Sequence, residues 1–333
     1  MQTFHSASTV PRIEELEPQL DSIGVTSGFL DADYPVLLDS ALVRRDLGRY
    51  SYVTADPFLV VRSKGRLVEI VEGGDVTYLE DEPFSVVKRL LSKFRMDRQP
   101  GGPPFQGGAI GYFGYEMGRL LERLPGTAVD DLALPDMSLG FYDWVFAFDH
   151  GSGRAWVFTT EFSREGRAQW ALDRIENRRF AEASTNEKPA TATDLRSNFG
   201  REQYIQAVDR VKEYIVAGDI YQANISQRLE ATVDTDAWEL YKSLRNTASA
   251  PFGAFLGFPE STILSASPEQ FLRVENDFVE TRPMKGTRPR GATPEEDNRL
   301  RKELASSEKD RAENIMIVDL LRNDLGRVCT PGS

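Results

Sequence analysis

The first half of the chain alternates short apolar stretches with turn signals, a pattern typical of antiparallel strands rather than of helices. Between residues 36 and 158 the turn signals are clusters of glycine and proline at residues 73–74, 100–104 and 150–153. Residues 141–148 and 154–160 are rich in aromatic and β-branched side chains and flank the last of these turns. We therefore expect a β-hairpin there, followed by a helix over residues 163–179.

The second half changes to helical spacing of its apolar positions. Residues 201–217 carry apolar side chains on one helical face, and Gly218 follows, where a glycine can end a helix by adopting left-handed backbone angles. Apolar and polar side chains alternate over residues 221–226, which predicts a strand with one polar face. A threonine, a proline and a glutamate at residues 293–296 form a capping box that opens a further helix, and Ser307 can cap the next one.

Strands followed by helices predict an α+β fold, with a large antiparallel sheet core flanked by helices. At 333 residues the chain has room for two domains of ordinary size. Residues 181–194 are small and polar with little apolar bulk, a composition typical of a linker. We expect one domain over residues 1–180 and a second over residues 195–333.

Composition argues against several classes of protein. The net charge of −12 is the opposite of what a nucleic-acid-binding surface needs. The two histidines, His5 and His150, leave little material for a Ser-His-Asp hydrolase or a histidine-rich metal site. Cys329 is the single cysteine, which fits a reducing compartment. The first thirty residues are acidic and lack a long apolar run, so we expect neither a secretory signal nor a transmembrane segment, and a cytoplasmic location.

The candidate chemistry centres on Lys285 in the basic loop of residues 281–291, sixteen residues after Glu269. A lysine acts as a nucleophile when it is neutral, and because free lysine titrates near pH ~10.4 it needs desolvation or nearby positive charge. The alternative is an ordinary exposed basic loop, since most lysines lie on the surface. Glu269 is similarly either a catalytic acid or the cap of the turn that begins at Pro268. The residue types alone leave both alternatives open.

Two further carboxylates are candidates for metal binding. Asp310 and Glu313 are three residues apart in the predicted helix after Ser307 and therefore share a face. Their oxygens could hold a hard cation such as Mg²⁺. Exposed charge beside Lys309 and Arg311 is the alternative interpretation.

Four blocks of the sequence occur in the order and spacing of a known enzyme family: residues 218–227, 265–272, 281–291 and 307–328. In these blocks the chain resembles the chorismate-utilising enzymes. The resemblance covers most of the chain, because landmarks of the family's N-terminal region are similar to residues 37–40, 48–51 and 107–116. Within the family the chain most resembles aminodeoxychorismate synthase component I, since the related anthranilate synthases usually carry alanine at the position of Lys285.

The resemblance implies roles for single residues. Lys285 would attack ring carbon C2 of chorismate, Glu269 would protonate the departing C4 hydroxyl, and Glu313 would bind the Mg²⁺ that holds the ring carboxylate. Ammonia from a separate glutamine amidotransferase subunit would then add at C4. The product would be 4-amino-4-deoxychorismate, a precursor of 4-aminobenzoate and hence of folate. The implied substrate-binding residues are Gly286, Thr287 and Arg288.

The resemblance also implies an architecture. It suggests a two-sheet fold in which residues 1–180 form the N-terminal domain and residues 195–333 the first part of the chorismate-binding catalytic domain. The family's catalytic domain continues beyond the residues that match Ser333, so we expect a C-terminally truncated chain that is inactive alone. One side of a tryptophan pocket would be formed by Leu38, Asp39 and Ser40, whereas Ala248 and Ser249 depart from the Asn-Pro that the family usually has on the other side.

Two alternatives compete with this function. Anthranilate synthase component I, of tryptophan synthesis, is the nearest enzyme, and isochorismate synthase is a more distant one. The other alternative is a truncated, non-catalytic subunit that binds chorismate or the amidotransferase. Lys285 favours the amination enzyme over anthranilate synthase.

Overall fold

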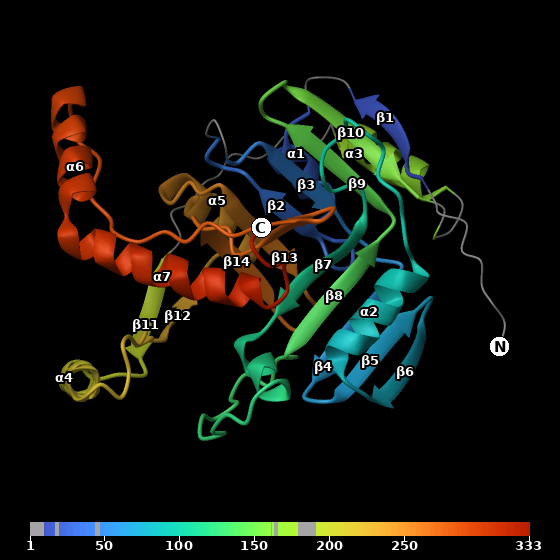
Figure 1. Cartoon of the computed structure of the whole chain (residues 1–333). Helices are drawn as coiled ribbons and strands as arrows, with labels where there is room; N and C mark the ends of the chain where they lie inside the picture. Colours follow the sequence, from blue (N-terminus) through green and yellow to red (C-terminus); the bar gives the residue numbers. More distant parts are fainter. Residues whose placement is uncertain (1–9, 17–19, 44–46, 161, 163–165, 179–190) are drawn as a thin grey trace. The chain divides into compact units, whose positions relative to one another are not determined.

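The computed structural model describes residues 10–16, 20–43, 47–160, 162, 166–178 and 191–333 (Figure 1). Its contacts divide the chain into two compact units, one formed by residues 1–181 and 244–333 and the other by residues 182–243. The first unit therefore combines segments from both halves of the sequence. Most of the predicted linker, residues 181–190, lies outside the described residues, and the predicted domain boundary stays a prediction.

The larger sheet of the first unit has seven strands in the order β1-β10-β9-β3-β2-β13-β14, all paired antiparallel. Its β9–β10 pair is the predicted hairpin. The pairing of β2 with β13 joins the N-terminal region to the second half of the chain. The strands are β1 (Arg12–Leu16), β2 (Val36–Asp39), β3 (Tyr50–Thr54), β9 (Trp144–Asp149), β10 (Arg154–Thr159), β13 (Phe252–Gly257) and β14 (Thr262–Ser267).

The second sheet of this unit has five antiparallel strands in the order β6-β5-β4-β8-β7. Helix α2 (Pro83–Lys93) packs on it through Val86, Val87 and Leu90, which share a core cluster with Leu59 and Met137. The strands are β4 (Leu59–Lys64), β5 (Leu67–Glu72), β6 (Asp75–Glu80), β7 (Gly108–Phe113) and β8 (Met137–Tyr142). Two antiparallel sheets with helices confirm the predicted α+β fold.

Shorter elements complete the first unit. A small hairpin and the helices α6 and α7 precede the C-terminal residues, and α6 and α7 meet at a corner (Figure 1). Thr293 and Ser307 cap these two helices as predicted, by accepting the backbone N–H groups of Glu296 and Asp310. The elements are α1 (Ser22–Ser27), the 3₁₀ helix η1 (Tyr115–Leu120), α3 (Arg167–Arg178), β15 (Arg273–Glu275), β16 (Phe278–Glu280), α6 (Pro294–Ser306) and α7 (Glu308–Gly326).

The second unit is smaller. Strands β11 (Ala192–Ser197) and β12 (Leu229–Val233) pair antiparallel, and α4 (Arg201–Ala217) has the bounds predicted from its apolar spacing. Gly218 ends α4 in the left-handed conformation, with φ 81°. Residues 221–226, all described, form no strand. The prediction of a strand there is wrong: alternation describes how a strand would place its side chains, but a strand also needs a neighbouring strand to pair with its backbone groups. Helix α5 (Ala237–Thr247) then leads out of this unit.

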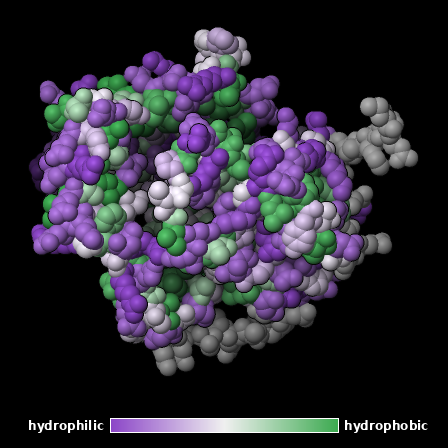
Figure 2. Space-filling view, turned by 90° about the horizontal axis from the view of Figure 1, so that it is seen from below, coloured by the Kyte–Doolittle hydropathy of each residue, from purple (hydrophilic) through white to green (hydrophobic). Residues whose placement is uncertain are grey.

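The surface of the chain carries both hydrophilic and hydrophobic residues. Hydrophilic residues cover much of the face in Figure 2, with hydrophobic residues in separate patches between them. Apolar side chains are exposed in the segments that carry the predicted chemistry, among them Phe271, Met284 and Ile315. Among the described residues, no helix combines the length and apolar character needed to cross a membrane.

Asp143 lies at the point where the chain passes from β8 in one sheet to β9 in the other. Asp143 is 1% exposed, and its carboxylate oxygens accept no hydrogen bond from the described residues. The nearest cation is Arg167, whose Nε lies 3.9 Å from Oδ1. Burial raises the pKa of Asp143 to about 6, although the charge of Arg167 partly opposes this. A buried carboxylate without hydrogen bonds destabilises the folded chain when it is ionised.

We expect Asp143→Asn to raise the free energy of unfolding at pH 7.5 by about 2 kcal/mol, because the raised pKa penalises the charged form. The folded state holds this proton more tightly than the unfolded state, whose aspartate titrates near ~3.9. The advantage of asparagine should therefore grow as pH rises through the window between about 4 and 6, and level off above it. Urea unfolding at several pH values measures this. Asp97→Asn, at an exposed position, is the control. A stability gain that does not vary with pH would contradict the assignment.

Candidate active site on the lysine loop

The predicted nucleophile and the predicted metal ligand lie next to each other. Residues 281–291, all described, contain no helix or strand, and this lysine loop runs from β16 to α6. Lys285 Nζ lies 3.9 Å from Glu313 Oε1 on α7. The two side chains are 27% and 36% exposed, so each is partly buried yet open to a ligand. The structure thus brings together two residues that are far apart in sequence.

Glu269 follows the end of β14 and is also held against the lysine loop. Its backbone N–H lies 3.4 Å from the hydroxyl of Ser267, which fixes the turn after the strand. Its Oε1 accepts a hydrogen bond of 2.9 Å from the N–H of Met284, the residue directly before Lys285. Glu269 is exposed, so the described residues do not provide the burial that we expected around a general acid.

The three predicted substrate-binding residues occupy different positions in the loop. Gly286 has a φ of 76°, a left-handed conformation that favours glycine, and it packs against α6 and α7. Thr287 is exposed. Arg288 donates from Nε to Glu303 Oε1 at 2.9 Å and from Nη2 to Asp310 Oδ2 at 3.1 Å. The guanidinium of Arg288 is thus already bound by two carboxylates.

The structure distinguishes between the two candidate carboxylates of α7. The carboxylate of Asp310 forms an ion pair with Arg288. Asp310 lies in the first turn of α7, where its backbone N–H donates to the hydroxyl of Ser307. Contacts with Ser307 and Arg288 hold the pKa of Asp310 below its usual range. Glu313, one turn later, faces Lys285. In the described part of the chain no three histidine, cysteine or acidic side chains cluster as a metal site. Glu313 fits Mg²⁺ as one protein ligand, since Mg²⁺ often takes one or two carboxylates and completes its shell with substrate oxygens and water.

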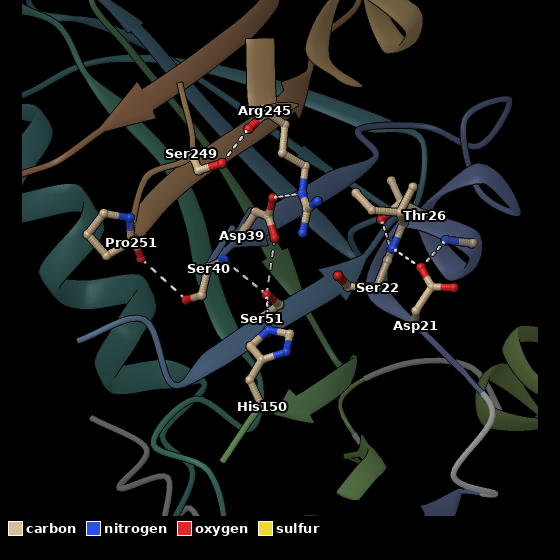
Figure 3. A network of polar contacts seen from close by, with 12 residues as sticks. Asp21, Ser22, Thr26, Asp39, Ser40, Ser51, His150, Arg245, Ser249 and Pro251 are labelled. Carbon is tan, nitrogen blue, oxygen red and sulfur yellow. Dashed lines mark hydrogen bonds and ion pairs between the residues drawn. The ribbon is translucent and has the colours of Figure 1, made fainter. Parts of the chain in front are cut away.

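A second polar cluster surrounds Asp39, in the predicted tryptophan pocket (Figure 3). The Asp39 side chain is fully buried at the end of β2. Its Oδ2 accepts a 2.6 Å hydrogen bond from Nε of Arg245, and its Oδ1 accepts one of 3.2 Å from the hydroxyl of Ser51. Ser51 Oγ also lies 2.8 Å from Nε2 of His150 and accepts the N–H of Ser40 at 3.0 Å. Because Ser51 has one proton to donate, the tautomer of His150 consistent with this network carries its proton on Nε2.

Asp39, Ser40 and Ser51 each form hydrogen bonds with other residues of the chain. Ser51 is fully buried, so it is no nucleophile despite its histidine and aspartate neighbours. The hydroxyl of Ser40 lies 2.6 Å from the carbonyl of Tyr50 and 3.3 Å from that of Pro251. Leu38, which pairs with Ala254, packs into the neighbouring core. A ligand amino group would have to compete with Arg245 for Asp39. The tryptophan pocket of Leu38, Asp39 and Ser40 stays a prediction.

Two anchoring residues were missed by sequence reasoning. Arg245 carries no local signal, because its partner Asp39 lies 206 residues away. Asp310 was considered as a metal ligand, and its pairing with Arg288, 22 residues earlier, follows from no sequence spacing. The one signal in the sequence was that the lysine loop is basic while α7 carries acidic residues, which is compatible with ion pairs between them.

Comparison with known proteins identifies the class of protein to which this site belongs. Residues 42–333 match the family described as chorismate binding enzyme. The chain belongs to this family, and the predicted resemblance is confirmed.

Relatives of the chain are found in two branches of this family. The chain is 40% identical over 303 residues to aminodeoxychorismate synthase component 1 of Escherichia coli strain K12, an alignment that covers 90% of this chain and 65% of the relative. It is 36% identical over 326 residues to anthranilate synthase component 1 of Acetivibrio thermocellus, covering 93% and 66%. The crystal structure of anthranilate synthase component I from Streptococcus pneumoniae superposes with a TM-score of 0.70 at 27% identity, covering 86% of this chain and 63% of that one. The chain thus spans about 65% of the length of the first of these relatives.

We expect Arg245→Gln to lower the free energy of unfolding by about 3 kcal/mol, because it removes a cation that is bound to the buried carboxylate of Asp39. The double variant with Asp39→Asn should be more stable than the sum of the single changes predicts, since no buried charge remains. Denaturant unfolding measures both effects. Lys93→Gln breaks an ion pair in which both side chains are about half exposed, and as a control it should change stability by less than about 1 kcal/mol. Equal losses in the two single-site variants of Arg245 and Lys93 would contradict this interpretation.

Proposed function

We propose that this chain is component I of an aminodeoxychorismate synthase, which converts chorismate and ammonia to 4-amino-4-deoxychorismate. The observation that carries the proposal is Lys285 beside Glu313, at the position where the resembling anthranilate synthases usually have alanine. The 40% identity with the Escherichia coli relative supports the same branch of the family.

In the proposed reaction the neutral amine of Lys285 attacks ring carbon C2 while the bond between C4 and its hydroxyl breaks. Glu269 donates a proton to the departing oxygen, which leaves as water. Ammonia then bonds to C4 as the bond between lysine and C2 breaks, and the protons released by the two amines restore the acid and the lysine. Chorismate and ammonia are consumed, and aminodeoxychorismate and water are formed.

The proposed Mg²⁺ site rests on Glu313. A bound Mg²⁺ would supply positive charge for a carboxylate of the substrate. Glu313 would hold the ion through a carboxylate oxygen, and its contact with Lys285 keeps the ion site beside the nucleophile. The contact from Met284 to Glu269 holds the acid against the same loop.

The proposal includes a partner and a pathway. Ammonia would come from a glutamine amidotransferase subunit, consistent with the name component 1 of the relatives. The product would lead to 4-aminobenzoate and folate. A cytoplasmic location fits the single cysteine and the acidic N-terminal residues.

Anthranilate synthase component I is the second candidate function. It is favoured by the 36% identity with the Acetivibrio thermocellus relative and by the TM-score of 0.70 with the Streptococcus pneumoniae structure. The two candidates differ in the product, because anthranilate formation releases pyruvate and needs no lysine nucleophile.

We expect the full native protein, given chorismate, Mg²⁺ and ammonium, to form aminodeoxychorismate, identified by its mass. Lys285→Ala should lower the turnover number by roughly 10³-fold or more, the scale expected when a catalytic nucleophile is removed. Lys302→Ala changes an exposed lysine of α6 and should leave turnover within about twofold, as expected for a surface substitution.

Two results would overturn the proposal. Anthranilate and pyruvate as the products would assign the chain to the other branch of the family. Aminodeoxychorismate formed equally fast without Lys285 would remove its role as nucleophile.

A further inference from the structure

The lysine loop has to be held in place by contacts other than a helix or sheet, because its residues, all described, form neither. Three sets of contacts hold it. Near its start, Met284 N–H is bound by Glu269. In its middle, Arg288 is bound by Glu303 and Asp310. At its end, Arg290 pairs with Asp297 at 2.6 Å and 2.9 Å.

Among these, the pair of Arg288 with Asp310 is the more enclosed of the two arginine contacts. The side chains of Arg288 and Asp310 are 27% and 18% exposed, whereas that of Arg290 is 80% exposed. An ion pair shielded from water holds its partners more firmly than an exposed one. Arg288 also reaches α6 and α7 at once, through Glu303 and Asp310, so it fixes the loop against the corner between the two helices.

The backbone directly after Lys285 rests on the same aspartate. A Cβ atom at Gly286 would lie 2.9 Å from Cδ1 of Leu304 and 3.0 Å from Cβ of Asp310. Asp310 is therefore in contact with the loop on both sides of Thr287, through the backbone of Gly286 and the side chain of Arg288. Its own position is set by the cap from Ser307 at the start of α7.

Helix geometry connects this contact to the site. Asp310 and Glu313 lie on neighbouring turns of the same face of α7. The aspartate holds the loop, and the glutamate lies 3.9 Å from Lys285 Nζ. A shift of the loop along α7 would change the distance between Lys285 and Glu313 directly.

We propose that Arg288 and Asp310 act together as positioning residues that hold Lys285 beside Glu313, and that Arg288 does this in place of binding the substrate. The proposal rests on the proposed function only in taking Lys285 as the reacting group. Neither residue needs to touch chorismate for this role. Their effect is on where Lys285 stands, so they should influence kcat more than KM.

A double-mutant cycle on the full native protein, with chorismate, Mg²⁺ and ammonium, tests the proposal. Arg288→Gln and Asp310→Asn should each lower kcat by roughly 10- to 100-fold, the scale expected for a misplacement of about 1 Å. KM for chorismate should change by less than about threefold, because neither variant removes a contact with the bound substrate. The double variant should be no slower than the worse single variant, since both changes break one contact. Arg290→Gln is the matched control, and its kcat should stay within about twofold, as expected for an exposed ion pair.

Hydrogen exchange gives a second measurement that needs no catalysis. The N–H of Met284 is bound to Glu269 only while the loop is in place. Arg288→Gln and Asp310→Asn should speed amide exchange in the peptide of residues 282–289 by about tenfold, the effect of losing a charged hydrogen bond. Arg290→Gln should leave it unchanged there, and circular dichroism should show the same helix content in all variants.

The outcomes separate this proposal from the proposed function. A wild-type protein that makes no aminodeoxychorismate contradicts the function, while faster exchange in the two variants still supports the positioning contact. A KM raised tenfold or more by Arg288→Gln, with kcat kept and Asp310→Asn silent, makes Arg288 a substrate ligand and overturns the proposal. Unchanged exchange in both variants also overturns it.

Discussion

The pairing of β2 with β13 is the interaction on which the rest of the first unit depends. It joins residues 36–39 to residues 253–256, more than 200 positions later, and the long loop between them costs entropy on closure. Burial offsets that cost, because the paired residues Val36 and Leu256 share an apolar cluster. The opposite end of this strand pair, where Asp39 lies across from Gly253, is reinforced by the ion pair of the buried Asp39 carboxylate with Arg245.

From that strand pair the chain leads directly to the candidate site. β13 pairs with β14, and Glu269 follows where β14 ends. Glu269 binds the N–H of Met284, and the loop then reaches α6 and α7 through Arg288. The position of Lys285 is thus set from two directions, by the sheet through Glu269 and by the helix corner through Arg288. A site built this way does not need helix or strand structure in the loop itself.

How much could be predicted from sequence depended on whether the signal was local. The caps at Thr293 and Ser307 and the end of α4 at Gly218 were correct because each depends on a few neighbouring residues. The apolar run of residues 141–148 gave no sign that the chain passes from one sheet to the other at Asp143. Strands β8 and β9, on either side of it, are both buried on both faces and therefore look alike in sequence. The contacts of the site, such as Lys285 with Glu313, had no local signal, and their expected roles came from the family resemblance.

The charges of the site explain why an arginine belongs at position 288. Two carboxylates one helical turn apart repel each other, and Glu303 brings a third acid to the same corner. Arg288 offsets the charges of Asp310 and Glu303 with one planar group that can donate in two directions. Glu313 then keeps Lys285 as its neighbour and remains beside the reacting amine. An arginine drawn away to an anionic substrate would break the ion pair with Asp310 and leave Glu303 paired with Arg299. The charge distribution that shapes the loop therefore favours keeping Arg288 within it.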